Sequence, residues 1–508
     1  MPKYLLAHDL GTSGNKATLF TTEGELIRSS TRAYPTRYYN GNWAEQDPED
    51  WWRAVCDSSR DLLAAVDPAD VLAVAFSGQM MGCLCVDKSG TPLADSIIWA
   101  DMRAQDAERF IIERVGAREF FHIAGHRPGA SYALAKFLWL REEHPDVYRN
   151  THKILQAKDY MVFKLTGRFC TDYSDAGGTN AFDMNTFTWS DAILDAVNVP
   201  REVFPEAVES TRVVGEVTAA AAEACGLKKG TSVVMGAGDG GCGALGAGCI
   251  QNGDTYCCMG TSAWIAGTTA KPVLDKHQTL FCFAHVIPGC YMPTGTMQAA
   301  GSSYAYVKRT FFDDIIAKAE AAGKDVYDLL NEMIEASPRG AKGLLYLPYL
   351  TGERSPRWNP LATASFLGMT MNHTREDYLR ATIEGVAMNL AVILRAFREN
   401  AAIDDLILTG GGAQGDVVTK ILADVLGCSM TRTNHPKEAT SMAAAVIAGV
   451  GAGLYEGFDA IYRFIDLMPS MKPDAQAQKY YEERIRVFDD CYEALKGVYA
   501  ELRTDKED

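Results

Sequence analysis

The sequence predicts an α/β protein made of two domains that share a topology. With 508 residues, the chain is too long for a single hydrophobic core to organise. A strand, a Gly-Thr-Ser turn and a second strand occur around Gly11, and the same order recurs around Gly260, about half a chain later. Since helix-forming segments follow both groups of strands, we expect each domain to be a mixed sheet flanked by helices. We place the boundary near Gly246, which gives domains of residues 1–246 and 247–508.

The first domain should open with three strands and then a helix. Short apolar segments separated by turn residues are typical of strands. Asp47 can cap the helix that follows, with Pro48 in its first position, because proline fits there without losing a helical hydrogen bond. The strands expected in this domain cover residues 4–10, 16–21, 25–30, 71–76 and 232–235.

The second domain repeats this pattern and then becomes mainly helical. An amphipathic helix is expected over residues 375–399, and another helix should start after Gly410-Gly411-Gly412. The charged stretch at residues 475–502 is predicted to be one long helix. The strands expected in this domain cover residues 254–259, 263–268 and 405–409.

Composition excludes several classes of partner. The net charge of −16 argues against binding to nucleic acid or an anionic membrane, because phosphate contacts need basic patches. No apolar run reaches the roughly twenty residues that cross a bilayer. The thirteen cysteines form no Cys-x-x-Cys pair, so we expect small buried thiols in a reducing compartment. With no signal-peptide pattern at the N-terminus, the expected location is the cytoplasm.

The first candidate site is Asp9-Leu10-Gly11-Thr12-Ser13, where a strand ends in a tight turn. Backbone N–H groups and hydroxyls in such a turn can bind a phosphate. Asp9 could hold a hydrated Mg²⁺ beside it, since that ion keeps several waters and needs few carboxylates. The alternative is an ordinary hairpin turn in which the aspartate bonds locally.

The second candidate site is the glycine-rich segment from Gly236 to Gly241. It matches Gly-x-Gly-x-x-Gly after a strand, which also indicates a dinucleotide-binding fold. Asp239, however, would put a carboxylate where a pyrophosphate should bind. At a helix N-terminus this carboxylate is kept ionised and can accept a proton from a substrate hydroxyl. A simple helix cap is the alternative interpretation.

Two further segments complete the candidate site. The glycine turn before Ala413 leaves room for a flat group such as adenosine, although many strand-to-helix turns look alike, and Gly301 lies in a similar, weaker segment. A sugar needs an apolar face and several hydroxyl partners. Residues of this kind could instead be core methionines and a surface Asp–Arg ion pair. The candidate sugar-binding residues are Gln79, Met80, Met81, Trp99, Asp101, Arg103 and Asp239.

Taken in order, these segments resemble the FGGY family of carbohydrate kinases. Residues 347–356, Leu-Pro-Tyr-Leu-Thr-Gly-Glu-Arg-Ser-Pro, are similar to the xylulokinase branch of that family. No Gly-x-x-x-x-Gly-Lys-[Ser/Thr] motif occurs, which excludes a P-loop kinase. The other matching segments are residues 9–13 (first phosphate motif), 77–82 (sugar contact), 136–140 (N-terminal signature), 238–240 (catalytic aspartate), 365–385 (C-terminal signature) and 411–413 (adenosine motif).

The resemblance implies two actin-like (ribonuclease H-like) ATPase domains with a cleft that closes on ATP and a sugar. It implies ATP and Mg²⁺ as cofactors, Asp239 as general base, and Asp9 as a second catalytic residue, with both carboxylates at the metal. The ATP-binding residues that it implies are Gly11, Thr12, Ser13, Lys16, Gly260, Thr261, Ser262, Gly301, Gly411, Gly412, Ala413 and Asp416.

The xylulokinase branch implies D-xylulose as acceptor and D-xylulose 5-phosphate as product. Met81 stands where that branch carries histidine, so ribulose, erythritol, glycerol and gluconate stay open as the sugar or polyol substrate. A homodimer is compatible with the resemblance. Two other classes remain as alternatives: a nicotinamide-dependent oxidoreductase that uses the glycine loop, and a non-catalytic actin-like sensor of sugar and ATP.

Overall fold

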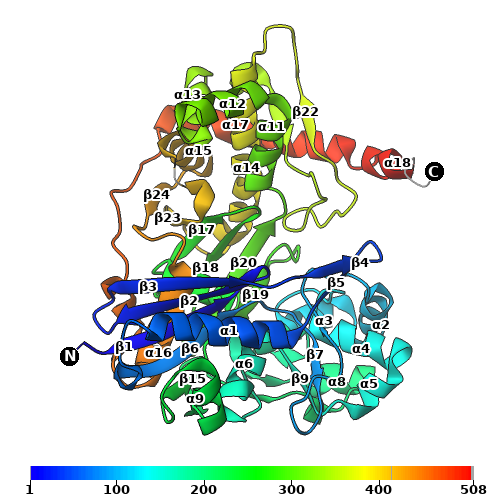
Figure 1. The fold of residues 1–508 in the computed structure, drawn as a ribbon. Coiled ribbons are helices and arrows are strands. Elements are labelled where there is room, and N and C mark those ends of the chain that lie inside the picture. Colours follow the sequence, from blue (N-terminus) through cyan, green and yellow to red (C-terminus); the bar gives the residue numbers. More distant parts are fainter. Residues whose placement is uncertain (1, 414, 505–508) are drawn as a thin grey trace.

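Two sheets with the same strand order form the centres of two lobes (Figure 1). The structure is a computed structural model and describes residues 2–413 and 415–504. In the N-terminal lobe, β1 (Tyr4–Leu10) pairs antiparallel with β2 (Gly14–Thr21) and parallel with β6 (Val71–Gly78). The sheet continues with β3 (Leu26–Ala33) beside β2, and with β15 (Ser232–Val234), β14 (Val213–Glu216) and β16 (Ala237–Gly238) on the β6 side.

The C-terminal lobe repeats this arrangement. β17 (Thr255–Met259) pairs antiparallel with β18 (Ala263–Gly267) and parallel with β23 (Asp405–Thr409). β20 (Tyr291–Met297) and β19 (Phe281–Ala284) extend the sheet beyond β18, and β24 (Ser429–Arg432) extends it beyond β23. The central order β15-β6-β1-β2-β3 therefore has its counterpart in β24-β23-β17-β18-β20. This confirms the prediction of two mixed sheets with related topology.

The helices bear out most of the sequence predictions. α1 (Pro48–Leu63) begins where expected, and the Asp47 carboxylate accepts a hydrogen bond from the Glu49 N–H. α14 (Arg375–Arg398) and α15 (Asp416–Leu426) also agree with prediction. The single long helix predicted at residues 475–502 is wrong. The structure has α17 (Ala475–Leu495) and α18 (Val498–Thr504) instead, with Gly497 between them, a residue with low helix propensity.

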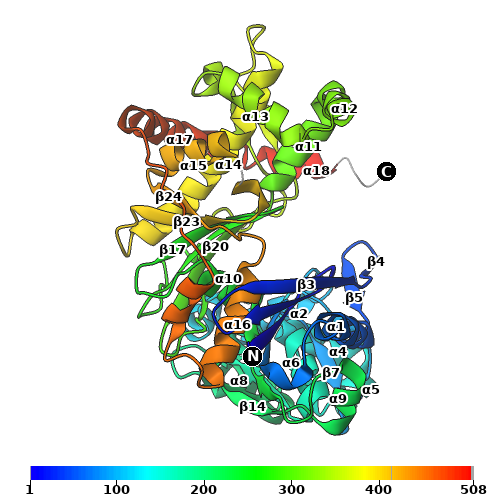
Figure 2. The ribbon, with the colours of Figure 1, turned by 60° about the vertical axis from the view of Figure 1, so that its left-hand side comes forward.

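One helix from the C-terminal half of the sequence packs on the N-terminal lobe. α16 (Ala439–Gly451) lies against β1 and β6 and crosses α10 (Asp239–Gly246), as Figure 2 shows. At the crossing, a side chain on Gly246 would overlap the Ala439 carbonyl, so only glycine fits. Leu5 and Ala7 of β1 share a hydrophobic core with the alanine-rich face of α16. Residues near 440 are thereby brought beside the end of β1.

The remaining elements cover the sheets and build the outer parts of both lobes. All thirteen cysteines lie among the described residues, and each is a free thiol. Across residues 2–413 and 415–504, none of the helices combines the length and apolar character that crossing a bilayer requires. The other helices are α2 (Gln105–Val115), α3 (Ala117–Ala124), α4 (Ala133–Glu143), α5 (Pro145–Asn150), α6 (Ala157–Thr166), α7 (Tyr173–Gly177), α8 (Asp191–Val197), α9 (Ala219–Cys225), α11 (Gly301–Phe311), α12 (Asp313–Ala322) and α13 (Val326–Ala336). The short strands are β4 (Arg37–Tyr39), β5 (Trp43–Gln46), β7 (Leu84–Val86), β8 (Ser96–Ile97), β9 (Lys153–Leu155), β10 (Cys170–Asp172), β11 (Phe182–Asp183), β12 (Thr188–Trp189), β13 (Glu206–Val208), β21 (Leu345–Leu347) and β22 (Ser365–Leu367).

Candidate active site

The two Gly-Thr-Ser turns occupy equivalent places in the two sheets. One follows β1 and the other follows β17, and each leads into the antiparallel neighbour of that strand. The Gly11 N–H donates to the Gly14 carbonyl at 3.0 Å, and the Gly260 N–H donates to the Ser262 carbonyl at 2.9 Å. Both turns are therefore tight hairpins, as the sequence predicts.

Side chains from the predicted sugar segments surround the first turn. The Trp99 indole N–H donates to the Thr12 hydroxyl at 2.8 Å. Gln46 donates to the Thr12 carbonyl at 2.6 Å and accepts a hydrogen bond from the Gln79 side chain at 2.8 Å. Within residues 2–413 and 415–504, the carbonyl oxygen of the buried Gln79 side chain finds no hydrogen-bond partner. The structure thus brings Gln79 and Trp99 beside the predicted phosphate turn, and exposes Ser13 next to Thr12.

The second turn opens onto a pocket of about 1070 Å³. Backbone N–H groups of Ala300 and Ser302 donate to the Thr261 carbonyl at 3.1 and 3.0 Å, and Gly301 donates to the Gly260 carbonyl at 3.0 Å. A side chain on Gly301 would overlap that carbonyl, so glycine is required there. Six residues predicted to bind ATP line this pocket: Gly260, Thr261, Gly301, Gly411, Gly412 and Asp416.

The other residues predicted to bind ATP have different positions. Ser262 closes the hairpin through its carbonyl and does not line the pocket. Lys16 pairs with Glu438 and donates to the Lys437 carbonyl at 2.9 Å, just before α16 begins. Ala413 ends the turn that Gly411 begins, and its side chain lies outside the described part of the structure.

Asp239 is the first residue of α10, directly after β16. Its side chain is open to solvent on one side, and protein atoms crowd the others. This burial is the larger cause, and the negative charge of Asp9 the smaller one, of a pKa of Asp239 that is raised to about 7. Asp9 itself accepts a hydrogen bond from the Thr440 hydroxyl of α16 at 2.7 Å. The two carboxylates predicted to be catalytic are therefore close enough to interact electrostatically.

A buried polar network holds the turn that carries Asp239. The Gly238 N–H donates to the Ser174 hydroxyl at 3.0 Å, and that hydroxyl donates to Asp172 at 2.6 Å. Lys158 pairs with Asp172 at 2.8 Å and with Asp175 at 2.9 Å, and these three charged side chains have no exposed surface. Because each partner is fixed by another, the backbone before Asp239 has little freedom to move.

The four remaining sugar candidates divide into two groups. Met80 packs against Gly238, and Met81 is half-buried beside it with a φ of 66°. Asp101 is 0% exposed, and both of its oxygens accept hydrogen bonds from Arg103. The Arg103 guanidinium lies 3.8 Å from the ring centre of Trp43. Asp101 and Arg103 therefore form an ion pair, as in the alternative interpretation, but the pair is buried and not at the surface.

Sequence reasoning missed several residues at this site. Thr440 is distant from Asp9 in the sequence, and a threonine in an alanine-rich helix gives no local signal. Lys136 lies in a segment that resembles the family's N-terminal signature, and its neighbours in the sequence indicate no separate role for it. Three tyrosines and an asparagine on α11 and α13 line the large pocket, and no pattern in the sequence singled them out. They are Tyr304, Tyr306, Tyr327 and Asn331.

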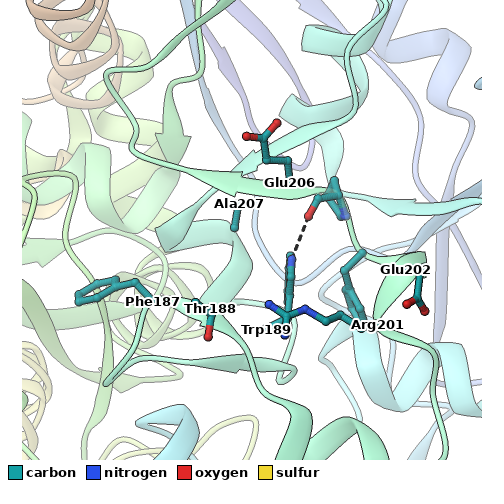
Figure 3. Close-up of a pocket in the computed structure, with 9 residues that line it drawn as sticks. Phe187, Thr188, Trp189, Arg201, Glu202, Glu206 and Ala207 are labelled. Atoms are coloured by element: carbon teal, nitrogen blue, oxygen red, sulfur yellow. Dashed lines mark hydrogen bonds between the residues drawn. The ribbon is translucent and has the colours of Figure 1, made fainter.

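A second hollow lies elsewhere on the N-terminal lobe. It has a volume of about 460 Å³ and is lined by residues around Phe187, Trp189 and Arg201 (Figure 3). The Trp189 indole donates to the Pro205 carbonyl at 2.9 Å, the dashed line in that view. None of the predicted site residues lines this hollow. It is a surface feature separate from the candidate site.

Comparisons with known proteins agree with this geometry. A xylulose kinase of Bacillus subtilis is 30% identical over 506 residues, which cover 99% of each chain. A gluconokinase of Bacillus licheniformis is 28% identical over 99% of this chain and 98% of its own. The crystal structure of a ligand-bound xylulose kinase from Lactobacillus acidophilus superposes with a TM-score of 0.92 at 26% identity, over 98% of this chain and all of its own.

Family models give the same answer. The N-terminal domain of the FGGY family of carbohydrate kinases matches residues 4–246, and its C-terminal domain matches residues 255–452. The fold is thus the two-domain, actin-like ATPase fold that the resemblance implied. The chain belongs to the FGGY family of carbohydrate kinases.

Proposed function

We propose that this carbohydrate kinase transfers the γ-phosphoryl group of ATP to D-xylulose, giving D-xylulose 5-phosphate, with Asp239 as general base. The observation that carries the proposal is Asp239 itself. It stands at the start of α10, open to solvent, with a pKa raised to about 7. A carboxylate whose pKa lies near neutral pH can accept a proton effectively, because it is ionised yet basic.

Phosphoryl transfer needs a nucleophile that is aligned and a charge that is neutralised. Asp239 would accept the proton of the sugar hydroxyl as that oxygen bonds to the γ-phosphorus and the bridging oxygen leaves with ADP. This proton transfer is worth about 10²–10⁴-fold in rate. The network from Gly238 through Ser174 to Asp172 supports the role, because it fixes the backbone next to the base.

ATP fits the large pocket of the C-terminal lobe. We infer that adenosine lies along Gly411, Gly412 and Ala413, near Asp416, and that the phosphates extend toward Thr261 and Gly301. Hydroxyl and N–H groups of Thr12 and Ser13 would bind the transferred phosphoryl group from the other lobe. Trp99 supports this role of Thr12, because it donates to the hydroxyl oxygen and so leaves the hydroxyl hydrogen available.

Mg²⁺ fits the acidic part of the site. Asp9 raises the pKa of Asp239, which means that the two negative charges repel each other where the phosphates would add more charge. A divalent cation relieves such repulsion, and Mg²⁺ binds through one or two carboxylates and phosphate oxygens. Asp9 and Asp239 would hold the ion, which when bound neutralises charge on the phosphates. The Thr440 hydroxyl, which donates to one Asp9 oxygen, would help to orient that carboxylate.

The sugar would bind among Gln79, Met81 and Trp99, with one hydroxyl directed at Asp239. D-Xylulose is the first choice because xylulose kinases are similar to this chain at 30% identity over its full length. Gluconate is a second candidate, because a gluconokinase is similar at 28% identity over nearly the same length. Met81 in place of a polar side chain leaves one sugar hydroxyl to find its partner elsewhere, so the acceptor needs a direct test.

The experiment is sugar-dependent ADP release with Mg-ATP across D-xylulose, D-ribulose, L-ribulose, glycerol, erythritol and gluconate. We expect the highest kcat/KM with D-xylulose. NMR of the product should show the phosphate on the terminal hydroxyl. A preference for gluconate would keep the mechanism and replace the substrate. ATP binding without turnover on any of these acceptors would contradict the kinase proposal and favour the sensor alternative.

A further inference from the structure

Lys136 is a buried lysine that has no carboxylate partner. It lies in α4, is 0% exposed, and makes no ion pair among the residues that the structure describes. Its ammonium group donates to three backbone carbonyl oxygens: Ser131 at 2.5 Å, Ile98 at 2.7 Å and Met81 at 2.9 Å. Lysine has three donors, so each N–H meets one acceptor. The Lys136 side chain therefore joins the start of its own helix to the segments of Met81 and Ile98, which lie 55 and 38 residues away in the sequence.

Lys158, the other fully buried lysine at this site, shows how unusual this arrangement is. Burial works against the charge of Lys158, but Asp159, Asp172 and Asp175 overcome it, and the pKa is raised well above its usual value. Lys136 lacks such partners, and burial lowers its pKa to about 7. Asp101 favours the charge of Lys136 from a distance, but burial outweighs it, and a buried ammonium without a paired carboxylate is costly for the fold. The benefit of Lys136 must therefore come from the three backbone segments whose carbonyls it holds together.

Two of these carbonyls belong to the segments that carry the proposed sugar wall. Met81 has a φ of 66°, in the left-handed region that a side chain with a Cβ rarely adopts, and its carbonyl is one of the three. Ile98 precedes Trp99, whose indole reaches Thr12 of the first turn. Lys136 thus fixes Met81 against the start of the Trp99 segment, and through Trp99 it connects the sugar wall to the phosphate turn.

We propose that Lys136 is a positioning residue for the acceptor sugar: by holding the carbonyls of Met81, Ile98 and Ser131 together, it sets the distance between the side chains of Met81 and Trp99. The proposal rests on the function proposed above, because it assumes that a sugar binds between these two side chains. Because Lys136 is fully buried, we expect it to contact neither sugar nor nucleotide, and to affect acceptor binding more than ATP binding.

The central test is Lys136→Met, which keeps a long apolar side chain and removes the three N–H donors. We expect the KM for the accepted sugar to rise at least about tenfold, since a displacement of about 1 Å in a binding group has effects of this size or larger. The KM for ATP should stay within about twofold, because the ATP pocket lies in the other lobe. The sugar is whichever member of the acceptor panel the unmodified enzyme uses.

Two further variants separate positioning from stability. Leu138→Ala removes a buried side chain from the same helix without touching Met81. It should lower the melting temperature as Lys136→Met does, yet leave the sugar KM unchanged. Lys136→Arg keeps the charge and some donors, so it should restore part of the sugar affinity, and it serves as the test variant if Lys136→Met does not fold.

Hydrogen exchange gives a readout that needs no sugar. Amides of residues 79–82 and 96–99 should exchange faster in Lys136→Met than in Leu138→Ala, whereas residues 236–241 should be unchanged in both. Normal exchange and a normal sugar KM in Lys136→Met would overturn the proposal. An enzyme that accepts no sugar at all would contradict the proposed function instead, and the exchange comparison would still decide the role of Lys136.

Discussion

The two Gly-Thr-Ser turns share a sequence and a hairpin but differ in everything around them. Side chains surround the first: Gln46 and Trp99 bond to Thr12, and the strand before it carries Asp9. Backbone surrounds the second, where N–H groups at Ala300 and Ser302 bond to Thr261 and the turn opens onto the large pocket. Cys258 stands where the first turn has Asp9. The turn geometry is thus local, whereas its chemical role depends on distant neighbours.

This difference assigns the two turns to two halves of one reaction. The acidic turn, with Asp9 and the neighbouring Asp239, suits proton transfer and a metal ion. The neutral turn, lined by glycine and hydroxyl groups, suits close approach of a nucleotide. Substitutions on the two sides should therefore have separable effects on catalysis, on ATP binding and on sugar binding.

The largest effect should come from Asp239→Asn, which removes the base from the acidic side. We expect kcat to fall about 10²–10⁴-fold, while the dissociation constant for ATP changes little. Enzyme assays and calorimetric titration with ATP would measure the two. Turnover within about threefold of the unmodified enzyme would exclude Asp239 as general base.

Asp239→Asn should also be more stable than the unmodified protein at pH 8. Folding raises the pKa of Asp239 to about 7 from its usual value near 3.8, so the native state binds this proton more tightly than the unfolded state. The stability that the protonated carboxyl contributes is complete below about pH 4 and is lost as the pH rises to about 7. The difference in melting temperature should therefore be constant above pH 7 and narrow below it.

Asp9→Asn should have the next largest effect. Loss of a residue that only supports a metal ligand costs about 10- to 100-fold in metal affinity or activity, and loss of a ligand should cost at least as much, so the Mg²⁺ concentration for half-maximal rate should rise. Cys258→Ser changes the equivalent position of the other turn and is the matched control. An equal change in Mg²⁺ dependence in both variants would remove the distinction between the two turns.

A smaller effect, confined to ATP, is expected on the neutral side. A methyl group at Gly411 meets no protein atom within 4 Å, so Gly411→Ala should fold normally and raise the KM for ATP by about tenfold, a loss of about 1.4 kcal/mol of binding. The KM for the sugar should not change. If the ATP KM also stays unchanged, adenosine does not lie against Gly411.

The smallest effect is expected for Trp99→Phe, which keeps the aromatic face and removes the hydrogen bond to Thr12. A hydrogen bond between neutral groups is worth about 1 kcal/mol, so kcat/KM should fall about fivefold. Trp99→Ala also removes the aromatic ring, so the KM for the sugar should be higher than in Trp99→Phe. Steady-state kinetics on both variants would separate the two contributions of this side chain.

Local features were predictable from the sequence, since their causes lie within a few residues. Asp47 and Pro48 indicate the start of α1, and the Gly-Thr-Ser tripeptides indicate both hairpins. The break between α17 and α18 also has a local cause, Gly497, whose weak helix propensity the charged pattern on both sides concealed.

Long-range packing accounts for what the sequence did not reveal. The Thr440 hydroxyl reaches Asp9 only because α16 returns to the N-terminal sheet. Asp101 and Arg103 have side chains suited to a sugar, and only the fold shows that they are buried against each other. The same holds for Lys136, since three carbonyls from separate segments give no pattern along the chain.

The pH dependence of kcat/KM in the unmodified enzyme and in Asp9→Asn tests the central claim most directly. Since the base must be ionised, activity should rise with an apparent pKa of about 7 or lower, because burial and the charge of Asp9 raise the pKa of Asp239 to about 7 and bound Mg²⁺ would lower it. With Mg²⁺ saturating for both enzymes, removal of the Asp9 charge should move the acid limb of the pH profile to lower pH, because Asp239 then ionises more easily. A limb that stays in place would show that Asp239 is not the group that titrates, and would contradict the account.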